Sequence, residues 1–151
     1  DGGYVKGDCL TVTGKTVAPP APTAPPAGGV PPAPTEPPVA LPPPVARTPP
    51  VYDNILEGIN RKTHIQLLRD ELGIETVERS IDRSELLLAD EVFLCGTGVQ
   101  IVSVTEIDFH PIGSGRMGPV VSQLRSLFFD IVRGRSPKYR DWCTPVYPAV
   151  G

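Results

Sequence analysis

Two short glycine-containing segments of this chain have the residue types that bind an anion through the backbone. The first runs from Leu56 to Arg61 and leads into a stretch with helical spacing, and the second, Gly96-Thr97-Gly98, lies between two apolar runs. A phosphate needs several N–H donors that converge on one point, and glycine and a helix start both favour this. The sequence therefore indicates an anion site formed by the amides of Ile59 and Asn60 and by the second turn. For that turn, a simple connection between two strands is the alternative interpretation.

The elements that must position these segments follow from the spacing of apolar residues. One helix is expected over residues 61–72, ended by Gly73, and another over 118–133, with Pro119 in its first turn and Gly134 after its end. Asp82 and Glu85 have capping-box spacing for a short helix from Ser84 to Ala89. Apolar runs predict strands at Thr76 to Ser80, Val92 to Cys95, Val99 to Val104 and Glu106 to Phe109. The fold class is therefore mixed α/β (α+β).

The helical spacing also predicts which side chains face the core. The expected apolar stripe of the last helix is formed by Val120, Leu124, Leu127, Phe128 and Ile131, and in the first helix Arg61, Ile65, Leu68 and Leu72 fall at helical spacing. His64 is expected on the exposed side of the first helix and His110 in a turn. Neither histidine has a partner at the spacing of metal ligands. No metal site is expected.

The order of motifs from residue 49 to 147 resembles the C-terminal half of a class IV (fold-type IV) pyridoxal-phosphate aminotransferase, and most closely a branched-chain amino acid aminotransferase. The matching segments are Thr48-Pro49-Pro50, Ile55 to Arg61, Gly73-Ile74-Glu75, Arg83 to Leu86, Ala89 to Phe93, Pro111-Ile112-Gly113, Gly118-Pro119 and Phe129 to Arg135. This resemblance implies the large C-terminal domain of a fold-type IV enzyme, incomplete here.

The resemblance also implies a role for each residue of the two segments. Gly58, Ile59, Asn60, Gly96 and Thr97 correspond to residues that bind the phosphate of pyridoxal 5'-phosphate. Thr97 and Gly98 correspond to residues that receive the α-carboxylate of the substrate. Asn60 departs from the threonine usual in the family, which puts a hydroxyl contact there in doubt.

The implied activity is transfer of the amino group of leucine, isoleucine or valine to 2-oxoglutarate. Branched-chain amino acids and 2-oxo acids are then the small-molecule partners, and a homodimer or higher homo-oligomer is expected at full length. The Schiff-base lysine of the family lies upstream of these motifs, and Lys6, Lys15, Lys62 and Lys138 do not match its position. We expect no catalytic residue in this chain and no activity of the chain alone. It is then either a fragment of the enzyme or a catalytically dead paralogue that acts as a binding module.

The first third of the chain has a different composition from the rest. Fifteen of the 20 prolines fall between Pro19 and Pro50, and only Glu36 and Arg47 are charged there. Such a stretch lacks the backbone donors of sheets and helices, which predicts a disordered, extended linker or loop insertion over residues 18–50. The expected organisation is a short remnant strand segment in 1–17, this linker, and the aminotransferase domain in 51–151. The segment Leu41 to Arg47 is either a ligand for SH3 or WW domains or a passive spacer.

Composition excludes several other classes of protein. The three cysteines, Cys9, Cys95 and Cys143, have no CxxC pairing, which argues against a zinc site and a disulfide scaffold. The net charge is −3 and basic residues are scattered, so no nucleic acid is expected as a partner. Apolar runs are too short to span a membrane. The expected location is the cytoplasm.

Overall fold

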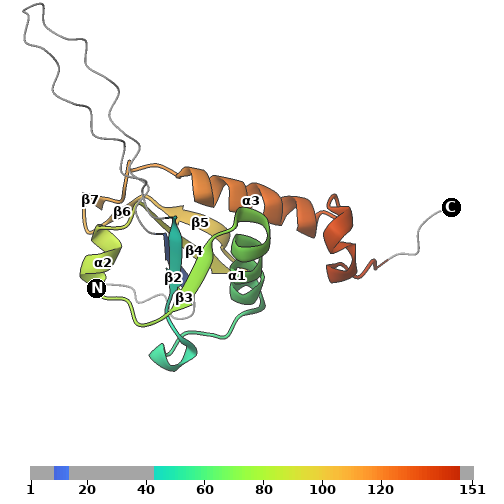
Figure 1. The fold of residues 1–151 in the computed structure, drawn as a ribbon, viewed down its shortest axis with the longest axis horizontal. Helices are drawn as coiled ribbons and strands as arrows, with labels where there is room; N and C mark the ends of the chain where they lie inside the picture. Colours follow the sequence, from blue (N-terminus) through green and yellow to red (C-terminus); the bar gives the residue numbers. More distant parts are fainter. Residues whose placement is uncertain (1–8, 14–42, 147–151) are drawn as a thin grey trace, which may run out of the picture.

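The computed structural model describes residues 9–13 and 43–146, which build one five-stranded mixed sheet with helices packed on it (Figure 1). The strand order is β3-β2-β1-β4-β5. The bounds are Cys9–Thr13 for β1, Val45–Thr48 for β2, Glu75–Glu78 for β3, Glu91–Gly96 for β4 and Gln100–Val104 for β5. The β2–β3 pair is parallel, whereas β1 is antiparallel to both β2 and β4. Strands β2 and β4 therefore run in the same direction.

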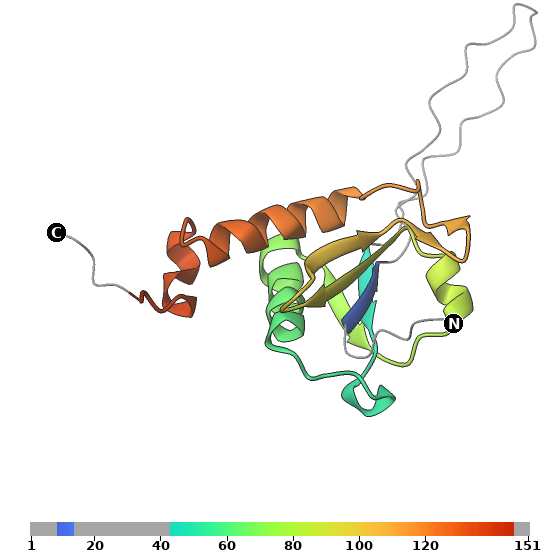
Figure 2. The ribbon, with the colours of Figure 1, turned by 180° about the vertical axis from the view of Figure 1, so that it is seen from behind.

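Two 14-residue helices, α1 (Ile59–Leu72) and α3 (Pro119–Val132), pack on one face of this sheet (Figure 2). Their shared core contains Ala46, Leu67, Leu68, Ile74, Phe93, Cys95, Ile101, Val121, Leu124, Phe128, Ile131 and Tyr139. Phe93 and Cys95 alternate along β4 and both reach this core, as the period of a strand requires. Val92 points to the opposite face. There it joins a smaller cluster with Ala89 and Ile112.

Shorter elements complete the fold around the sheet. The helix α2 (Arg83–Leu87) and a two-stranded ribbon, β6 (Glu106–Ile107) with β7 (His110–Pro111), border the smaller cluster. Two 3-10 turns, η1 (Val51–Asp53) and η2 (Pro137–Trp142), precede α1 and follow α3. The mixed α/β class expected from the sequence is confirmed.

The helix ends follow local signals. Gly73 adopts φ 64° and donates its N–H to the carbonyl of Leu68, which ends α1. Both halves of the capping box of Asp82 and Glu85 are formed at the start of α2. Gly134 with φ 69° follows α3. The core face of α3 differs slightly from the prediction, because Val121 is fully buried while Val120 and Leu127 are partly buried.

The predicted linker extends too far toward the C-terminus. Residues 45–48 form β2, and the side chains of Ala46 and Thr48 are completely buried. The four residues Val45 to Thr48 contain no proline, so each supplies an amide to the ladder, and β2 pairs with β3 in parallel. The remnant strand expected in 1–17 corresponds to β1, which lies in the centre of the sheet. Residues 14–42 lie outside the described residues, and so does most of the predicted linker.

Two further predictions from the sequence are wrong. The strand expected from Glu106 to Phe109 is a hairpin, because Asp108 and Phe109 turn the chain with φ of 50° and 63°, and His110 lies in β7. His64 is not on the exposed side of α1. Its side chain is only 1% exposed, and its ring lies 4.9 Å from the ring of Phe128.

Candidate anion-binding site

The two glycine-containing segments lie at the same edge of the sheet. Gly96 ends β4, and Thr48 ends β2, which runs in the same direction. The start of α1 is fixed at the end of β2, because the Arg61 side chain donates to the carbonyl oxygen of Pro49 at 2.9 Å. Strand β1 separates β2 from β4 in the sheet. At the usual spacing of strands, the lateral offset of β2 and β4 is about 10 Å.

The first amides of α1 have no acceptor among the described residues. The N-cap residue Gly58 has no side chain that could cap the helix. The first intrahelical hydrogen bond runs from the Lys62 amide to the Gly58 carbonyl at 3.2 Å. The amides of Ile59 and Asn60 lie before the donor of that bond, so they have no acceptor within the helix, as is usual for the first amides of a helix. The Ile59 side chain is 83% exposed, so this helix start faces solvent. It offers donors and the positive end of the dipole to an anion.

At the start of helix α3, a side chain of the protein itself accepts the first amides. The two carboxylate oxygens of Glu91 accept the amides of Val120 and Val121 at 3.0 and 2.9 Å. Glu91 is itself buried. A carboxylate at this position satisfies the orphan donors and the dipole together. The start of α1 has no equivalent acceptor among the described residues, which distinguishes it from α3.

Arg61 holds the start of α1 in position. Its guanidinium donates to Thr48 Oγ1 at 3.3 Å and to Glu78 Oε2 at 2.5 Å, in addition to the Pro49 carbonyl. The Arg61 side chain is 4% exposed, although Glu78 is half exposed. The helix is thereby tied to the ends of β2 and β3. The sequence pattern puts Arg61 at helical spacing with Ile65 and Leu68. It does not predict the partners of Arg61, because they are distant along the chain.

The second segment forms the tight turn between β4 and β5. Gly96 pairs with Gln100 across the hairpin, so the loop contains only Thr97, Gly98 and Val99. Gln100 has φ 57°, the left-handed conformation that often follows such a three-residue loop. Thr97 and Gly98 are exposed, and a Cβ added to Gly98 would meet no atom within 4 Å. The Thr97 hydroxyl and the neighbouring amides are therefore accessible from solvent.

The chain matches known proteins over the part that contains both segments. The sequence profile of the amino-transferase class IV family matches residues 44–107, from β2 to β6. Over these residues the chain has the sequence pattern of the class IV aminotransferases. It is 50% identical over 95 residues to a probable branched-chain-amino-acid aminotransferase of Aquifex aeolicus, which covers 63% of this chain and 30% of that protein. To the branched-chain-amino-acid aminotransferase of Pseudomonas aeruginosa it is 41% identical over 91 residues, covering 60% and 29%.

Solved class IV aminotransferase structures have the same fold. The chain matches the branched-chain amino acid aminotransferase from Thermobaculum terrenum in its PLP form with a TM-score of 0.72 and 35% identity, over 94% of this chain and 37% of that one. A second match is the branched-chain aminotransferase from Thermoproteus uzoniensis with norvaline, with a TM-score of 0.69 and 33% identity, over 93% and 37%. The chain thus spans about a third of the length of these class IV relatives.

The lysines of this chain agree with the expectation of surface charge where the structure describes them. Lys62 pairs with Glu57 at 2.8 Å, and Lys138 pairs with Glu71 at 2.5 Å. Each lysine side chain is 63% exposed. The hydrogen bond from Lys62 lowers the pKa of Glu57, which keeps that carboxylate ionised beside the start of α1. Lys6 and Lys15 lie outside the described residues.

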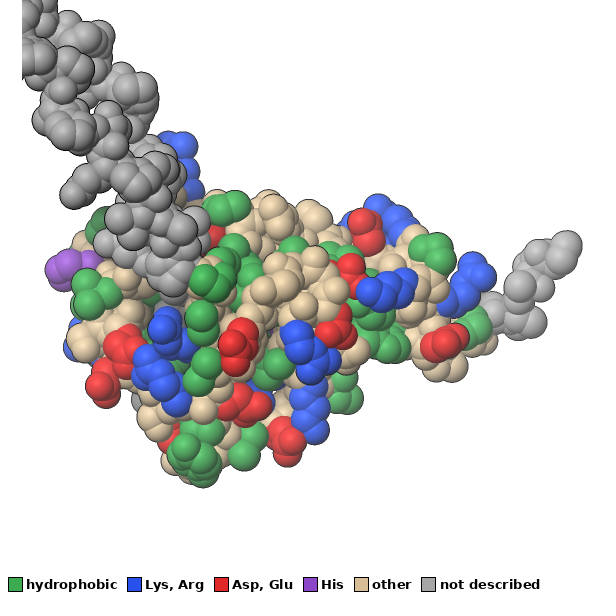
Figure 3. All heavy atoms as spheres, viewed as in Figure 1, with side chains coloured by type: hydrophobic (Ala, Val, Ile, Leu, Met, Phe, Trp, Pro, Cys, Tyr) green, Lys and Arg blue, Asp and Glu red, His purple; other side chains and the backbone are tan. Residues whose placement is uncertain are grey.

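The described residues contain neither a metal-binding cluster nor a membrane-spanning helix. Within residues 9–13 and 43–146 no cluster of three histidine, cysteine, aspartate or glutamate side chains is placed to bind a metal. Cys143 is a free thiol. Over the same residues, no helix has the length and apolar character needed to cross a membrane. On the face in Figure 3, acidic and basic side chains are interspersed.

Proposed function

We propose that this chain is part of a branched-chain aminotransferase and that its described residues hold the phosphate of pyridoxal 5'-phosphate. The observation that carries the proposal is the open start of α1, whose first amides have no acceptor among the described residues. The chain's relative from Thermobaculum terrenum was solved in a PLP form, which agrees with this role. The site offers N–H and O–H donors, which are the groups that a phosphate requires.

Each residue of the site then has a separate task. Gly58 brings the backbone close to the phosphate, and the amides of Ile59 and Asn60 donate to it. From the other side Gly96 allows close approach and the Thr97 hydroxyl donates. The amides of Thr97 and Gly98 receive the α-carboxylate of the amino acid substrate. When bound, the cofactor supplies a conjugated ring that withdraws electrons from the α-carbon of the substrate. The residues of this chain bind and orient both molecules.

The activity of the whole protein follows as part of the same proposal. The amino group of leucine, isoleucine or valine is transferred to 2-oxoglutarate, and a homodimer or higher homo-oligomer in the cytoplasm carries out the reaction. The tight, exposed turn from Gly96 to Gly98 offers backbone amides as donors. Such donors suit the α-carboxylate of an amino acid substrate better than its apolar side chain. Selection among the side chains of substrates is left to residues outside this turn.

A single substitution tests the phosphate site without disturbing the fold. In Ile59→Pro the ring removes the amide of the first helical residue, a position at which helices tolerate proline. Gly58 before it is already extended, with φ −74° and ψ 146°, as a residue before proline prefers. Helix α3 starts in the same way, with Gly118 followed by Pro119.

We expect Ile59→Pro to weaken binding of pyridoxal phosphate by the purified chain about tenfold to a hundredfold, the effect of losing one hydrogen bond to a charged group. Ile59→Ala is the matched control, because it removes an exposed side chain but keeps the amide, and it should bind like the wild type. Equal affinity of the two variants would contradict the proposed role of α1.

A further inference from the structure

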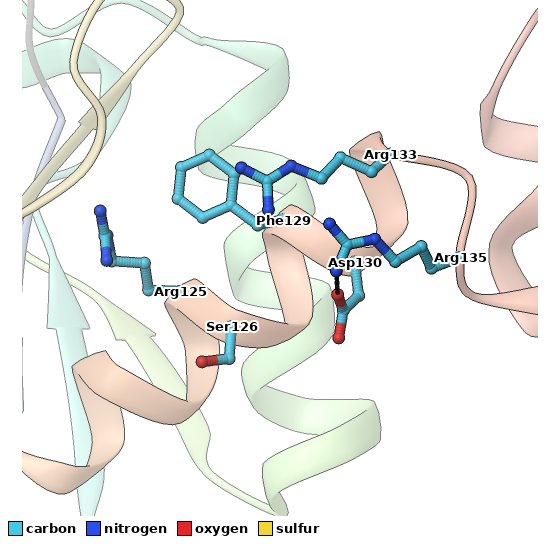
Figure 4. Close-up of a pocket in the computed structure, with 6 residues that line it drawn as sticks. All are labelled: Arg125, Ser126, Phe129, Asp130, Arg133 and Arg135. Atoms are coloured by element: carbon cyan, nitrogen blue, oxygen red, sulfur yellow. Dashed lines mark hydrogen bonds and ion pairs between the residues drawn. The ribbon is translucent and has the colours of Figure 1, made fainter.

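A cationic surface lies on α3 and shares no residue with the two glycine turns. Six residues line a hollow of about 380 Å³ on the outer side of this helix: Arg125, Ser126, Phe129, Asp130, Arg133 and Arg135 (Figure 4). Three arginines and one aspartate leave a net charge of +2. Asp130 is already paired with Arg135 at 3.2 Å. Arg125 and Arg133 have no acidic partner among the described residues.

The two unpaired arginines are held in place by one aromatic ring. The guanidinium carbons of Arg125 and Arg133 lie 5.1 and 5.0 Å from the ring centroid of Phe129. Figure 4 shows the Arg133 guanidinium over that ring and Arg125 beside it. Phe129 is itself fixed by an edge contact with the buried Phe128, at 5.9 Å between centroids. Stacking on an aromatic ring leaves the N–H edges of a guanidinium free to donate.

The spacing of these arginines indicates the shape of the partner. The two guanidinium carbons lie 5.1 and 5.0 Å from one ring centroid, so they are at most about 10 Å apart. Each guanidinium fork can receive its own carboxylate. A planar guanidinium binds a carboxylate through two parallel hydrogen bonds. The surface therefore fits an acidic segment with two carboxylates up to about 10 Å apart.

From this geometry we infer that the Arg125–Phe129–Arg133 surface docks an acidic segment of another protein. A nucleic acid fits less well, because Asp130 interrupts the positive charge and the whole chain carries a net charge of −3. The inference is independent of the phosphate site, since the surface lies on α3 and shares no residue with the two glycine turns.

The test uses the full 151-residue chain and a synthetic helical peptide rich in alanine with glutamate at positions i, i+4 and i+8. Binding should fall steeply as salt is raised, and a peptide with glutamine at the same positions should not bind. Arg125→Gln with Arg133→Gln should weaken binding about tenfold. The matched control Arg140→Gln, at an exposed arginine outside the hollow, should change binding less than about twofold.

Two further variants separate oriented forks from charge alone. Arg125→Lys with Arg133→Lys keeps the charge but removes the planar fork, and we expect binding to weaken about threefold to fivefold. Phe129→Leu should have a similar effect, and if that variant does not fold, the lysine variants carry the test. The inference is overturned if both peptides bind equally or neither binds. It is also overturned if inorganic phosphate or single-stranded DNA binds this surface more tightly than the acidic peptide.

Discussion

The Glu91 carboxylate accepts the amide of Val121 at 2.9 Å and so closes the start of α3 from a neighbouring strand. Helix α1 has the same length but has no such acceptor among the described residues, and its first amides face solvent. One helix start is thus completed within the protein, while the other is available to a ligand. This difference connects the packing of the sheet to the proposed phosphate site.

The Glu91 contact requires a glycine at the N-cap of α3. A Cβ added to Gly118 would lie 2.1 Å from the Glu91 carboxyl carbon. Gly118→Ala should therefore displace the carboxylate and lower the free energy of unfolding by about 2 to 3 kcal/mol. Urea denaturation followed by circular dichroism measures this change. Gly98→Ala is the control, because its added Cβ meets open space, and it should change the free energy of unfolding by less than about 0.5 kcal/mol.

The coupling of the two residues can be measured in a double-mutant cycle. If Gly118→Ala acts by displacing Glu91, it should cost much less in a Glu91→Ala background, where no carboxylate remains to be displaced. Equal costs in both backgrounds would show that the alanine acts elsewhere.

His64 should make the stability of the protein depend on pH in the weakly acidic range. Burial lowers its pKa to about 4, and neither ring nitrogen has a hydrogen-bond partner among the described residues. Histidine in the unfolded chain has its ordinary pKa of about 6.5. The unfolded state therefore binds the proton first, and stability falls as pH decreases from about 6.5 to 4.

Across that range the wild type should lose up to about 1.4 kcal/mol of unfolding free energy per pH unit. His64→Leu should remove most of this dependence and should also stabilise the protein, because it replaces an unsatisfied buried polar ring. The exposed His110 provides the control, His110→Gln, which should keep the wild-type slope. Urea titrations at several pH values provide the measurement. If the free energy of unfolding of His64→Leu still depended on pH as in the wild type, a group other than His64 would bind the proton.

Arg61 should link the stability of α1 to the proposed phosphate site. Arg61→Met leaves Thr48 Oγ1 and the Pro49 carbonyl without this donor, which should cost about 2 kcal/mol of unfolding free energy. Binding of pyridoxal phosphate should weaken as well, because the helix start is no longer tied to β2. Arg69→Met removes an exposed pair with Asp70 and should have little effect on either measurement.

The peptide bond after Arg47, in β2, should resist proteolysis in the folded protein. Cleavage after Arg47 is expected if residues 18–50 are one extended linker, as the proline content predicts. In the structure Arg47 lies within β2 between two fully buried side chains, so trypsin should cleave there only after the domain unfolds. Rapid cleavage after Arg47 in the native protein, seen by mass spectrometry, would contradict the placement of β2.

The sequence was informative where the signal is local. The end of α1 at Gly73, the capping box of α2 and the proline at the start of α3 depend on a few neighbouring residues, and these predictions are confirmed. The family resemblance also came from short motifs in a fixed order. The class IV profile confirms it over residues 44–107.

Features that depend on distant contacts could not be predicted in this way. His64 is polar, and only its position over Phe93 and against Phe128 explains why it is buried. Strand β2 is short and follows a proline-rich stretch, so its pairing with β1 and β3 is not visible in composition. The partners of Arg61 likewise lie at the ends of two strands, 12 to 17 residues away along the chain.

The most direct test of the proposed site is an NMR titration of the backbone amides with pyridoxal phosphate, and separately with inorganic phosphate. If one phosphate binds between the two segments, the amide signals of Ile59, Asn60, Thr97 and Gly98 should shift together and give one dissociation constant. Signals near Arg125 and Arg133 should not follow the same curve. Shifts confined to only one of the two segments, or no shift in any of the four amides, would contradict the account.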